Sequence, residues 1–210
     1  MDVTHIVVVI IVILFSMTLH EAMHAFMGYW LGDDTAKLQG RLTLNPVKHI
    51  DPFLTLILPV TLAIIGAPIF GGAKPVPFNP ARVRFDEWGA ALVAIAGPST
   101  NLFIAFIAFG IFAVIGAPST GLLNEILITT VTVNLGFFVF NMIPIPPLDG
   151  SRVLYALAPE FVRRGMEVIE QFGIIFIFAV VFIASSAIGV YMLAAINFFL
   201  AIFAAIFGLS

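Results

Sequence analysis

The stretch Val3–Leu31, with the sequence VTHIVVVIIVILFSMTLHEAMHAFMGYWL, decides the class of fold that this chain adopts. A helix that crosses the hydrocarbon core of a bilayer needs about 20 predominantly apolar residues, and this stretch exceeds that length. It lacks the positively charged start and the small-x-small cleavage site that mark a secretory signal peptide. We therefore predict a retained transmembrane helix here.

The rest of the chain has the same apolar character. Of its 210 residues, 61% are hydrophobic and only 10% are charged, whereas a soluble domain carries about 25% charged residues. Further apolar segments lie at 52–70, 90–117, 125–145, 172–184 and 190–209. We predict an all-α fold: a polytopic transmembrane helix bundle with about five spanning helices plus a re-entrant or hairpin segment. Residues 1–210 should form a single membrane-embedded domain.

The nine basic residues predict the orientation of the helices. They fall in three loops: Lys37, Arg41, Lys48, Lys74, Arg82, Arg84, Arg152, Arg163 and Arg164. Because cytoplasmic loops carry an excess of Lys and Arg, we expect these loops and the C-terminus on the cytoplasmic side of the cell membrane, and the N-terminus outside. The first two loops flank 52–70, so this segment should be re-entrant or a shallow hairpin. A single tilted crossing would violate the charge rule.

Residues 20–24 read HEAMH, which places two histidines one helical turn apart on one face of the first apolar helix. His20 and His24 can then bind one zinc ion, and Glu21 beside them can act as a general base for water. The alternative is that all three are polar residues satisfied by packing contacts. In lipid, three ionisable groups within five residues are costly, which favours a functional site.

A catalytic zinc usually takes three protein ligands and one water. The chain has no cysteine, so the third ligand must be a histidine or a carboxylate. His5 is near the outer end of its helix and His49 is in a cytoplasmic loop. Asp149 is the better candidate, because it lies in NMIPIPPLDG at 141–150, whose prolines break the helix and free the chain to aim this side chain sideways. The alternative for Asp149 is an ordinary Asp-Gly turn.

The depth of Asp149 in the membrane can be compared with that of the histidine pair. His20 lies eleven residues before Leu31, about 16 Å along a helix. Asp149 lies nine residues before Ala158, about 14 Å if that stretch is helical. Both distances are measured from the cytoplasmic side. We therefore expect Asp149 to complete the metal site.

Four motifs together resemble the site-2 proteases, which are intramembrane zinc metalloproteases. They are HEAMH at 20–24, GGAKPVP at 71–77, GPSTN at 97–101 and NMIPIPPLDG at 141–150. The chain is most similar to the compact branch of that family, without PDZ or CBS domain. The resemblance implies hydrolysis of peptide bonds within or near transmembrane segments of membrane proteins, the reaction of regulated intramembrane proteolysis.

The resemblance also implies a role for the residues at the metal. His20, His24 and Asp149 would bind one zinc ion per chain, and Glu21 would be the catalytic base. Asn141 would be catalytic too, by positioning the substrate or stabilising the oxyanion. The alternative for Asn141 is an interhelical hydrogen bond.

Three further residues are candidates for contact with substrate. Asn101 is one of them, although an interhelical hydrogen bond is the alternative. Gly71 and Gly72 begin a Gly- and Pro-rich stretch, at 71–78, that could supply an extended edge to pair with an unwound substrate strand. His49 and Asp51 are expected to have capping or packing roles.

Two other functions are open at this point. A membrane metal transporter or channel would also use intramembrane His and carboxylate residues with broken helices. An inactive scaffold would only bind membrane partners. Glu21 discriminates a protease from both of these alternatives, because neither transport nor scaffolding needs a base beside the metal. The partners expected for a protease are a transmembrane protein substrate, the lipid bilayer, and a regulatory membrane partner or a second copy of the chain. No basic patch with interleaved aromatics occurs, so nucleic acid is not expected.

Overall fold

The computed structural model describes residues 3–57, 61 and 72–209, and every regular element within them is a helix. The helices are α1 (Val3–Leu31), α2 (Thr35–Leu38), α4 (Asp86–Val114), α5 (Leu122–Asn141), α6 (Asp149–Leu157), α7 (Glu160–Ile183) and α8 (Ser185–Phe207). Three short helical turns, η1 (Pro46–Lys48), η2 (Pro52–Ile57) and η3 (Pro80–Arg82), lie between α2 and α4. The prediction of an all-α fold is confirmed.

Four helices in the described part of the chain are long and apolar enough to cross a membrane: α1, α4, α5 and α8. α7 is bent by 97° between Glu160–Gly173 and Ile175–Ile183, and it adds a fifth span only if both parts count together. The bend lies at Gly173, whose φ of 52° is in the left-handed region that glycine adopts readily. Four or five candidate spans agree with the predicted number of about five.

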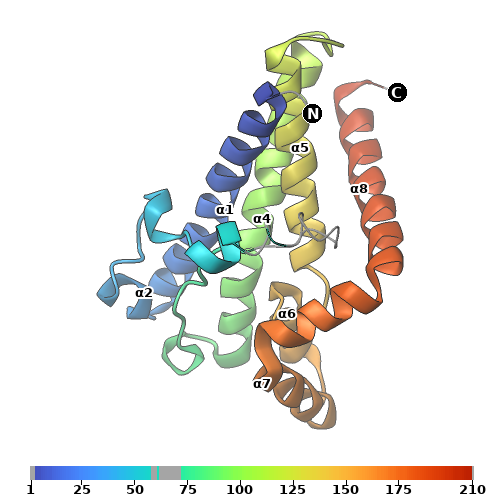
Figure 1. Cartoon of the computed structure of the whole chain (residues 1–210). Coiled ribbons are helices and arrows are strands. Elements are labelled where there is room, and N and C mark those ends of the chain that lie inside the picture. Colours follow the sequence, from blue (N-terminus) through green and yellow to red (C-terminus); the bar gives the residue numbers. More distant parts are fainter. Residues whose placement is uncertain (1–2, 58–60, 62–71, 210) are drawn as a thin grey trace.

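α4 is the central helix of the bundle, since α1, α5, α6 and α8 all pack against it (Figure 1). The first half of α4 buries mainly small residues, among them Ala90, Ala94 and Gly97. Small residues let helices approach closely in a membrane, where lipid tails are as apolar as the side chains and give no hydrophobic drive for association. α4 therefore lies close to the segment of α1 that carries the histidines.

The second half of α4 packs against α5 and α8 through larger side chains. Phe109 is buried there, and its ring centroid lies 5.7 Å from that of Phe203 in α8. The Phe106 ring also contacts Phe203, with the centroids 5.3 Å apart. Leu135 of α5 is fully buried in the same cluster. This cluster is the apolar core of the bundle.

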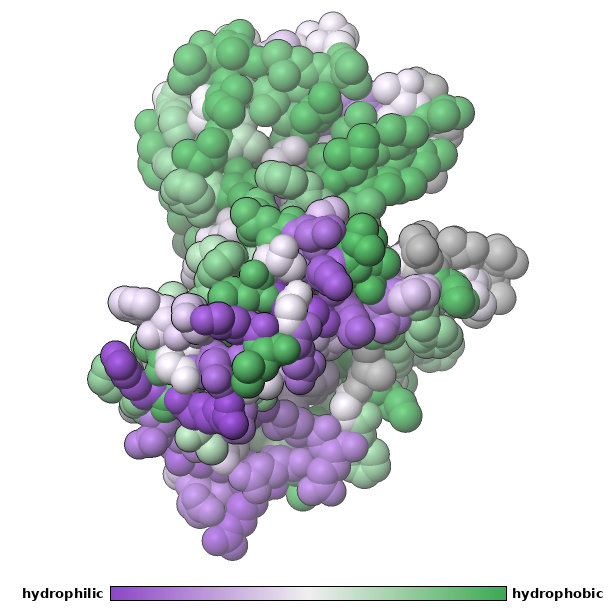
Figure 2. All heavy atoms as spheres, turned by 90° about the vertical axis from the view of Figure 1, so that its left-hand side faces the viewer, coloured by the Kyte–Doolittle hydropathy of each residue, from purple (hydrophilic) through white to green (hydrophobic). Residues whose placement is uncertain are grey.

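Hydrophilic residues gather at one end of the molecule: on the face in Figure 2 they cover the lower half, below a hydrophobic upper half. The loops after α1 and before α4 meet there. Arg41 donates to the Lys74 carbonyl at 2.7 Å, and Lys74 N donates to the His49 carbonyl at 2.9 Å. Arg82 pairs with Asp34 at 2.5 Å. The first two basic loops thus share one side, as predicted. That this side is cytoplasmic stays a prediction.

The two described ends of the segment between these loops also meet. Gly72 N donates to the Leu54 carbonyl at 3.1 Å, and Thr55 Oγ1 donates to the Gly72 carbonyl at 2.7 Å. The approach of these two ends is in line with the predicted re-entrant or hairpin segment. The predicted re-entrant path itself falls on 58–60 and 62–71, outside the described residues.

The start of α1 and the end of α8 lie at the same end of the bundle (Figure 1). That the N-terminus lies outside and the C-terminus on the cytoplasmic side stays a prediction. The second part of α7, Ile175–Ile183, has nine residues and is only about 14 Å long, against a hydrocarbon core of about 30 Å. This part cannot cross a membrane alone, so α7 counts as a fifth span only together with its first part.

Candidate metal centre

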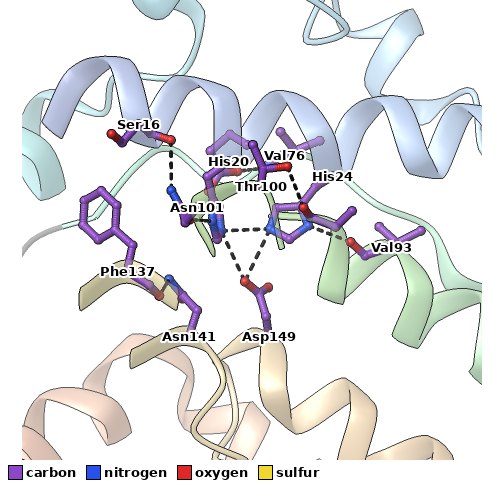
Figure 3. Close-up of polar contacts among 12 residues, drawn as sticks. Ser16, His20, His24, Val76, Val93, Thr100, Asn101, Phe137, Asn141 and Asp149 are labelled. Atoms are coloured by element: carbon purple, nitrogen blue, oxygen red, sulfur yellow. Dashed lines mark hydrogen bonds and ion pairs between the residues drawn. The ribbon is translucent and has the colours of Figure 1, made fainter. Parts of the chain in front are cut away.

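Two histidines of α1 and the first residue of α6 meet in the interior of the bundle (Figure 3). His20 Nε2 lies 3.2 Å and His24 Nε2 lies 3.4 Å from Asp149 Oδ2, and the two Nε2 atoms are 3.0 Å apart. Zinc binds nitrogen and carboxylate oxygen at about 2.0–2.2 Å, so tetrahedral ligand atoms stand about 3.3 Å from one another. The three side chains therefore fit a zinc ion by donor type and by spacing.

The helical spacing of the HEAMH motif explains how the two histidines come together. Residues four apart lie one above the other on a helix face, and the rings of His20 and His24 meet edge to face with centroids 4.6 Å apart. His20 is buried, with 6% of its surface exposed. The pair is thus presented on one face of α1, toward α4 and α6.

Both imidazoles are held through their second nitrogen. His24 Nδ1 is 2.8 Å from the Val93 carbonyl, and His20 Nδ1 is 2.6 Å from Asn101 Oδ1. A carbonyl oxygen only accepts, so His24 carries its proton on Nδ1 and turns the lone pair of Nε2 toward Asp149. Histidine ligands of metals usually have such a partner, which fixes the tautomer and the orientation of the ring.

Gly97 brings α4 directly against the two rings. A Cβ at this position would overlap Nε2 of His24 and would lie 2.8 Å from Cε1 of His20. No side chain larger than hydrogen fits without moving the imidazoles. The sequence singled out the motif around Gly97, but it gave no reason for the glycine; the reason is this contact.

Asp149 reaches the histidines because α5 stops and α6 starts at the same depth. α5 ends at Asn141, the proline-containing loop follows, and Asp149 opens α6, which packs against α4. This turn requires a glycine at position 150, since a Cβ there would overlap the Met142 carbonyl. Asp149 therefore lies beside the two histidines, as the comparison of depths in the sequence predicted. Its function as a metal ligand stays a prediction.

Glu21 lies at the edge of this group and touches the segment 72–79. Its Oε2 accepts a hydrogen bond from Val76 N at 3.0 Å. The segment is held at its far end by Asp33, which is buried and accepts from Asn79 N at 2.8 Å. The extended segment therefore runs beside the metal ligands and is tied to α1 at Glu21 and to the loop after α1 at Asp33.

The other predicted site residues are placed less directly. Asn141 lies beside Asp149 in Figure 3, and its amide donates to the Phe137 carbonyl of its own helix at 2.9 Å. Asn101 is fully buried and bonded to His20, which does not support the predicted contact with substrate. Gly72 uses its N–H and its carbonyl in the turn with η2. Gly71 lies outside the described residues.

Two buried polar residues near the metal centre belong to no motif. Asn134 of α5 and Ser16 of α1 are both fully buried, and they bond each other and Asn101. A signal for Asn134 was present in the sequence: an amide inside an apolar segment, two helical turns before Asn141, is costly in lipid unless it has partners.

A histidine pair, a carboxylate and an adjacent glutamate inside an apolar helix bundle define a membrane metalloprotease as the class of protein. Comparison with known proteins agrees. The family profile described as "Peptidase family M50" matches residues 117–184, which include Asp149. The chain belongs to this family, the site-2 protease family.

The relatives extend the match over most of the chain. "Putative zinc metalloprotease YwhC" of Bacillus subtilis is 41% identical over 192 residues, which cover 88% of this chain and 83% of the relative. "Putative zinc metalloprotease Rip2" of Mycolicibacterium smegmatis is 32% identical over 177 residues, 83% of this chain and 66% of the relative. Rip2 of Mycobacterium tuberculosis is 31% identical over 182 residues, with coverage of 84% and 66%. No solved structure matches the chain.

Proposed function

We propose that this chain is an intramembrane zinc metalloprotease that hydrolyses peptide bonds within or near transmembrane segments of other membrane proteins, as in regulated intramembrane proteolysis. One observation carries the proposal: a His-His-Asp group with ligand atoms 3.0–3.4 Å apart, formed between helices apolar enough to span a bilayer. One zinc ion per chain is proposed for this group.

The roles of the residues follow from their positions. Zinc held by His20, His24 and Asp149 would supply a Lewis acid that polarises water and the carbonyl of the substrate. Glu21 accepts the proton of the attacking water and returns it to the leaving amine. The hydrogen bond from Val76 N holds Oε2 of Glu21 in place. We assign the proton transfer to the other oxygen, Oε1.

The substrate enters this scheme as an extended strand. A helical transmembrane segment hides its amides in its own hydrogen bonds, so it must unwind locally before it is cleaved. The segment 72–79 has no regular secondary structure and runs beside Glu21, which supports the hypothesis that it pairs with the unwound strand. Proline at Ala73 or at Val76 should lower cleavage without removing zinc, and Ala73 is the cleaner test because Val76 N also bonds Glu21. Unchanged cleavage by both variants would contradict the pairing.

The orientation and the partners belong to the same proposal. The first two basic loops meet at one end of the bundle, and the charge rule assigns that end to the cytoplasm. Water would reach the ligands from this end, where α6 and its Asp149 lie. The natural substrate is proposed to be a transmembrane protein, and a regulatory membrane partner or a second copy of the chain is proposed to control cleavage.

The substitution Glu21→Gln tests the proposal. Purified wild type and variant are compared in lipid vesicles for cleavage of a transmembrane substrate and for bound zinc. A protease should lose at least about 100-fold in cleavage rate while its zinc content is kept, because only the base is removed. Full cleavage by the variant, or the same low background in both proteins, would contradict the assignment. In the second case, metal transport or scaffolding becomes the better account.

A further inference from the structure

Three polar residues from three different helices lie in the middle of the bundle with no exposed surface: Ser16 of α1, Asn101 of α4 and Asn134 of α5. Buried amides are costly unless they are hydrogen-bonded, and in lipid their partners must be protein groups. These three residues bond one another, and the chain of bonds ends at His20. The metal ligand is therefore coupled to a polar network that reaches α5.

The direction of the hydrogen bonds in this network is fixed at Asn134, the end away from His20. Asn134 Nδ2 lies 2.8 Å from the Thr130 carbonyl, which can only accept, and 2.8 Å from Ser16 Oγ. The side-chain NH₂ group of Asn134 must therefore point at the Thr130 carbonyl. Its carbonyl oxygen is then turned toward Asn101.

The same reasoning fixes the direction of the Asn101 side-chain amide. Asn134 Oδ1 lies 2.9 Å from Asn101 Nδ2, so Asn101 has to donate there. The Ser16 carbonyl, 3.5 Å from the same nitrogen, requires the same direction. Asn101 Oδ1 is left facing His20 Nδ1 at 2.6 Å, and an amide oxygen accepts only. His20 therefore carries its proton on Nδ1 and presents the lone pair of Nε2 to the metal position.

We propose that Asn134 is a positioning residue of the metal centre: it fixes the direction of the Asn101 amide and, through it, the tautomer of His20. The inference rests on the metal centre proposed above. His24 needs no such device, because its Nδ1 binds the Val93 carbonyl directly. His20 faces a side-chain amide, which could rotate and offer its N–H₂ group instead. Asn134 prevents that rotation.

The test compares zinc affinity in Asn134→Leu, Leu135→Ala and the double variant Asn101→Asp/Asn134→Leu, each purified in detergent. Leucine has the branched skeleton of asparagine but makes no hydrogen bond, so only the longer contact with the Ser16 carbonyl, at 3.5 Å, still opposes rotation of the Asn101 amide. We expect zinc to bind about 10-fold more weakly or worse, the usual effect of losing an outer partner of a histidine ligand. Leu135 is the adjacent residue and equally buried. Its truncation should lower the thermal stability and leave zinc affinity as in wild type.

The double variant separates a positioning role from a packing role. An ionised carboxylate at position 101 can only accept, so it holds the Nδ1 proton of His20 without help from Asn134. Zinc affinity should recover toward the wild-type value. The inference is overturned if Asn134→Leu binds zinc as tightly as wild type. It is also overturned if the carboxylate gives no recovery.

Nitrogen-15 NMR of the zinc-free protein reads the tautomer without using the metal. In wild type, the neutral form of His20 should carry its proton on Nδ1, whereas in Asn134→Leu it should be a mixture of tautomers. An unchanged tautomer in the variant would overturn the inference. If wild type binds no zinc, the proposed metal centre fails, and this spectrum still decides the role of Asn134.

Discussion

The two halves of α4 differ in what they pack against and in how much change they can accept. The first half meets α1 through small residues, and Gly97 touches the rings of both histidines. The second half meets α8 through phenylalanines, among them Phe109 and Phe203. A backbone in contact with two ligand rings has no room to adjust, whereas a cluster of rings beside lipid can repack. Function should therefore depend on the first half and stability on the second.

The largest effect is expected for Gly97→Ala. The added methyl group would overlap His24 and displace both imidazoles, so bound zinc and cleavage should fall to background. Gly136→Ala is the matched control, because a Cβ at Gly136 in α5 meets nothing within 4 Å. It should keep its zinc and be slightly more stable, by about 0.5–1 kcal/mol, since alanine favours a helix. Wild-type zinc content in Gly97→Ala would show that this contact is not tight.

A smaller effect, of another kind, is expected for Phe203→Ala in the second half. Loss of a buried ring costs about 3 kcal/mol, and here it also removes the contacts with Phe106 and Phe109. Thermal unfolding in detergent should occur at a lower temperature, while zinc per folded chain stays unchanged. If the variant unfolds at the wild-type temperature but loses zinc, the second half of α4 would serve function rather than stability, against our expectation.

The smallest effect is expected for Asp33→Asn, at the loop end of α1. Burial opposes the charge of Asp33, but hydrogen bonds from Thr35 and Asn79 outweigh it and hold the pKa of this carboxyl below its usual value. A lowered pKa in the folded state means that the stabilisation is full above about pH 4, the value in unfolded chains, and is lost as the pH falls through the folded pKa. We expect a loss of about 2 kcal/mol near neutral pH.

Unfolding measured against pH checks this expectation. The difference between wild type and Asp33→Asn should be largest near neutral pH and should shrink under strongly acid conditions. Asp34→Asn is the control, because Asp34 is about half exposed, and its pair with Arg82 at the surface contributes little. A difference that does not change with pH would mean that the charge of Asp33 is not what matters.

The sequence predicts the parts of the site that local spacing determines. The separation of His20 and His24 sets their common face, and the prolines before Asp149 set the break that brings it to the same depth. The contact at Gly97 and the direction of the Asn134 amide depend on which helices become neighbours. No local pattern contains that information, so the sequence could name Asn101 but left its role open between contact with substrate and an interhelical hydrogen bond.

The bend in α7 could not be predicted from the sequence for a related reason. Hydropathy treats 172–184 as one apolar segment, but the bend at Gly173 leaves only nine residues of straight helix before α8. Length along a straight axis decides whether a helix spans, and a backbone angle at one glycine decides that length. The basic loops, in contrast, were grouped correctly, because charge acts on every loop in the same way.

The zinc content of detergent-purified protein, wild type beside Asp149→Ala, tests the central claim most directly. We predict about one zinc per chain in wild type and a sharp loss in the variant, because a site with only two protein ligands binds weakly. No zinc in carefully prepared wild type, or full retention by the variant, would contradict the three-ligand centre.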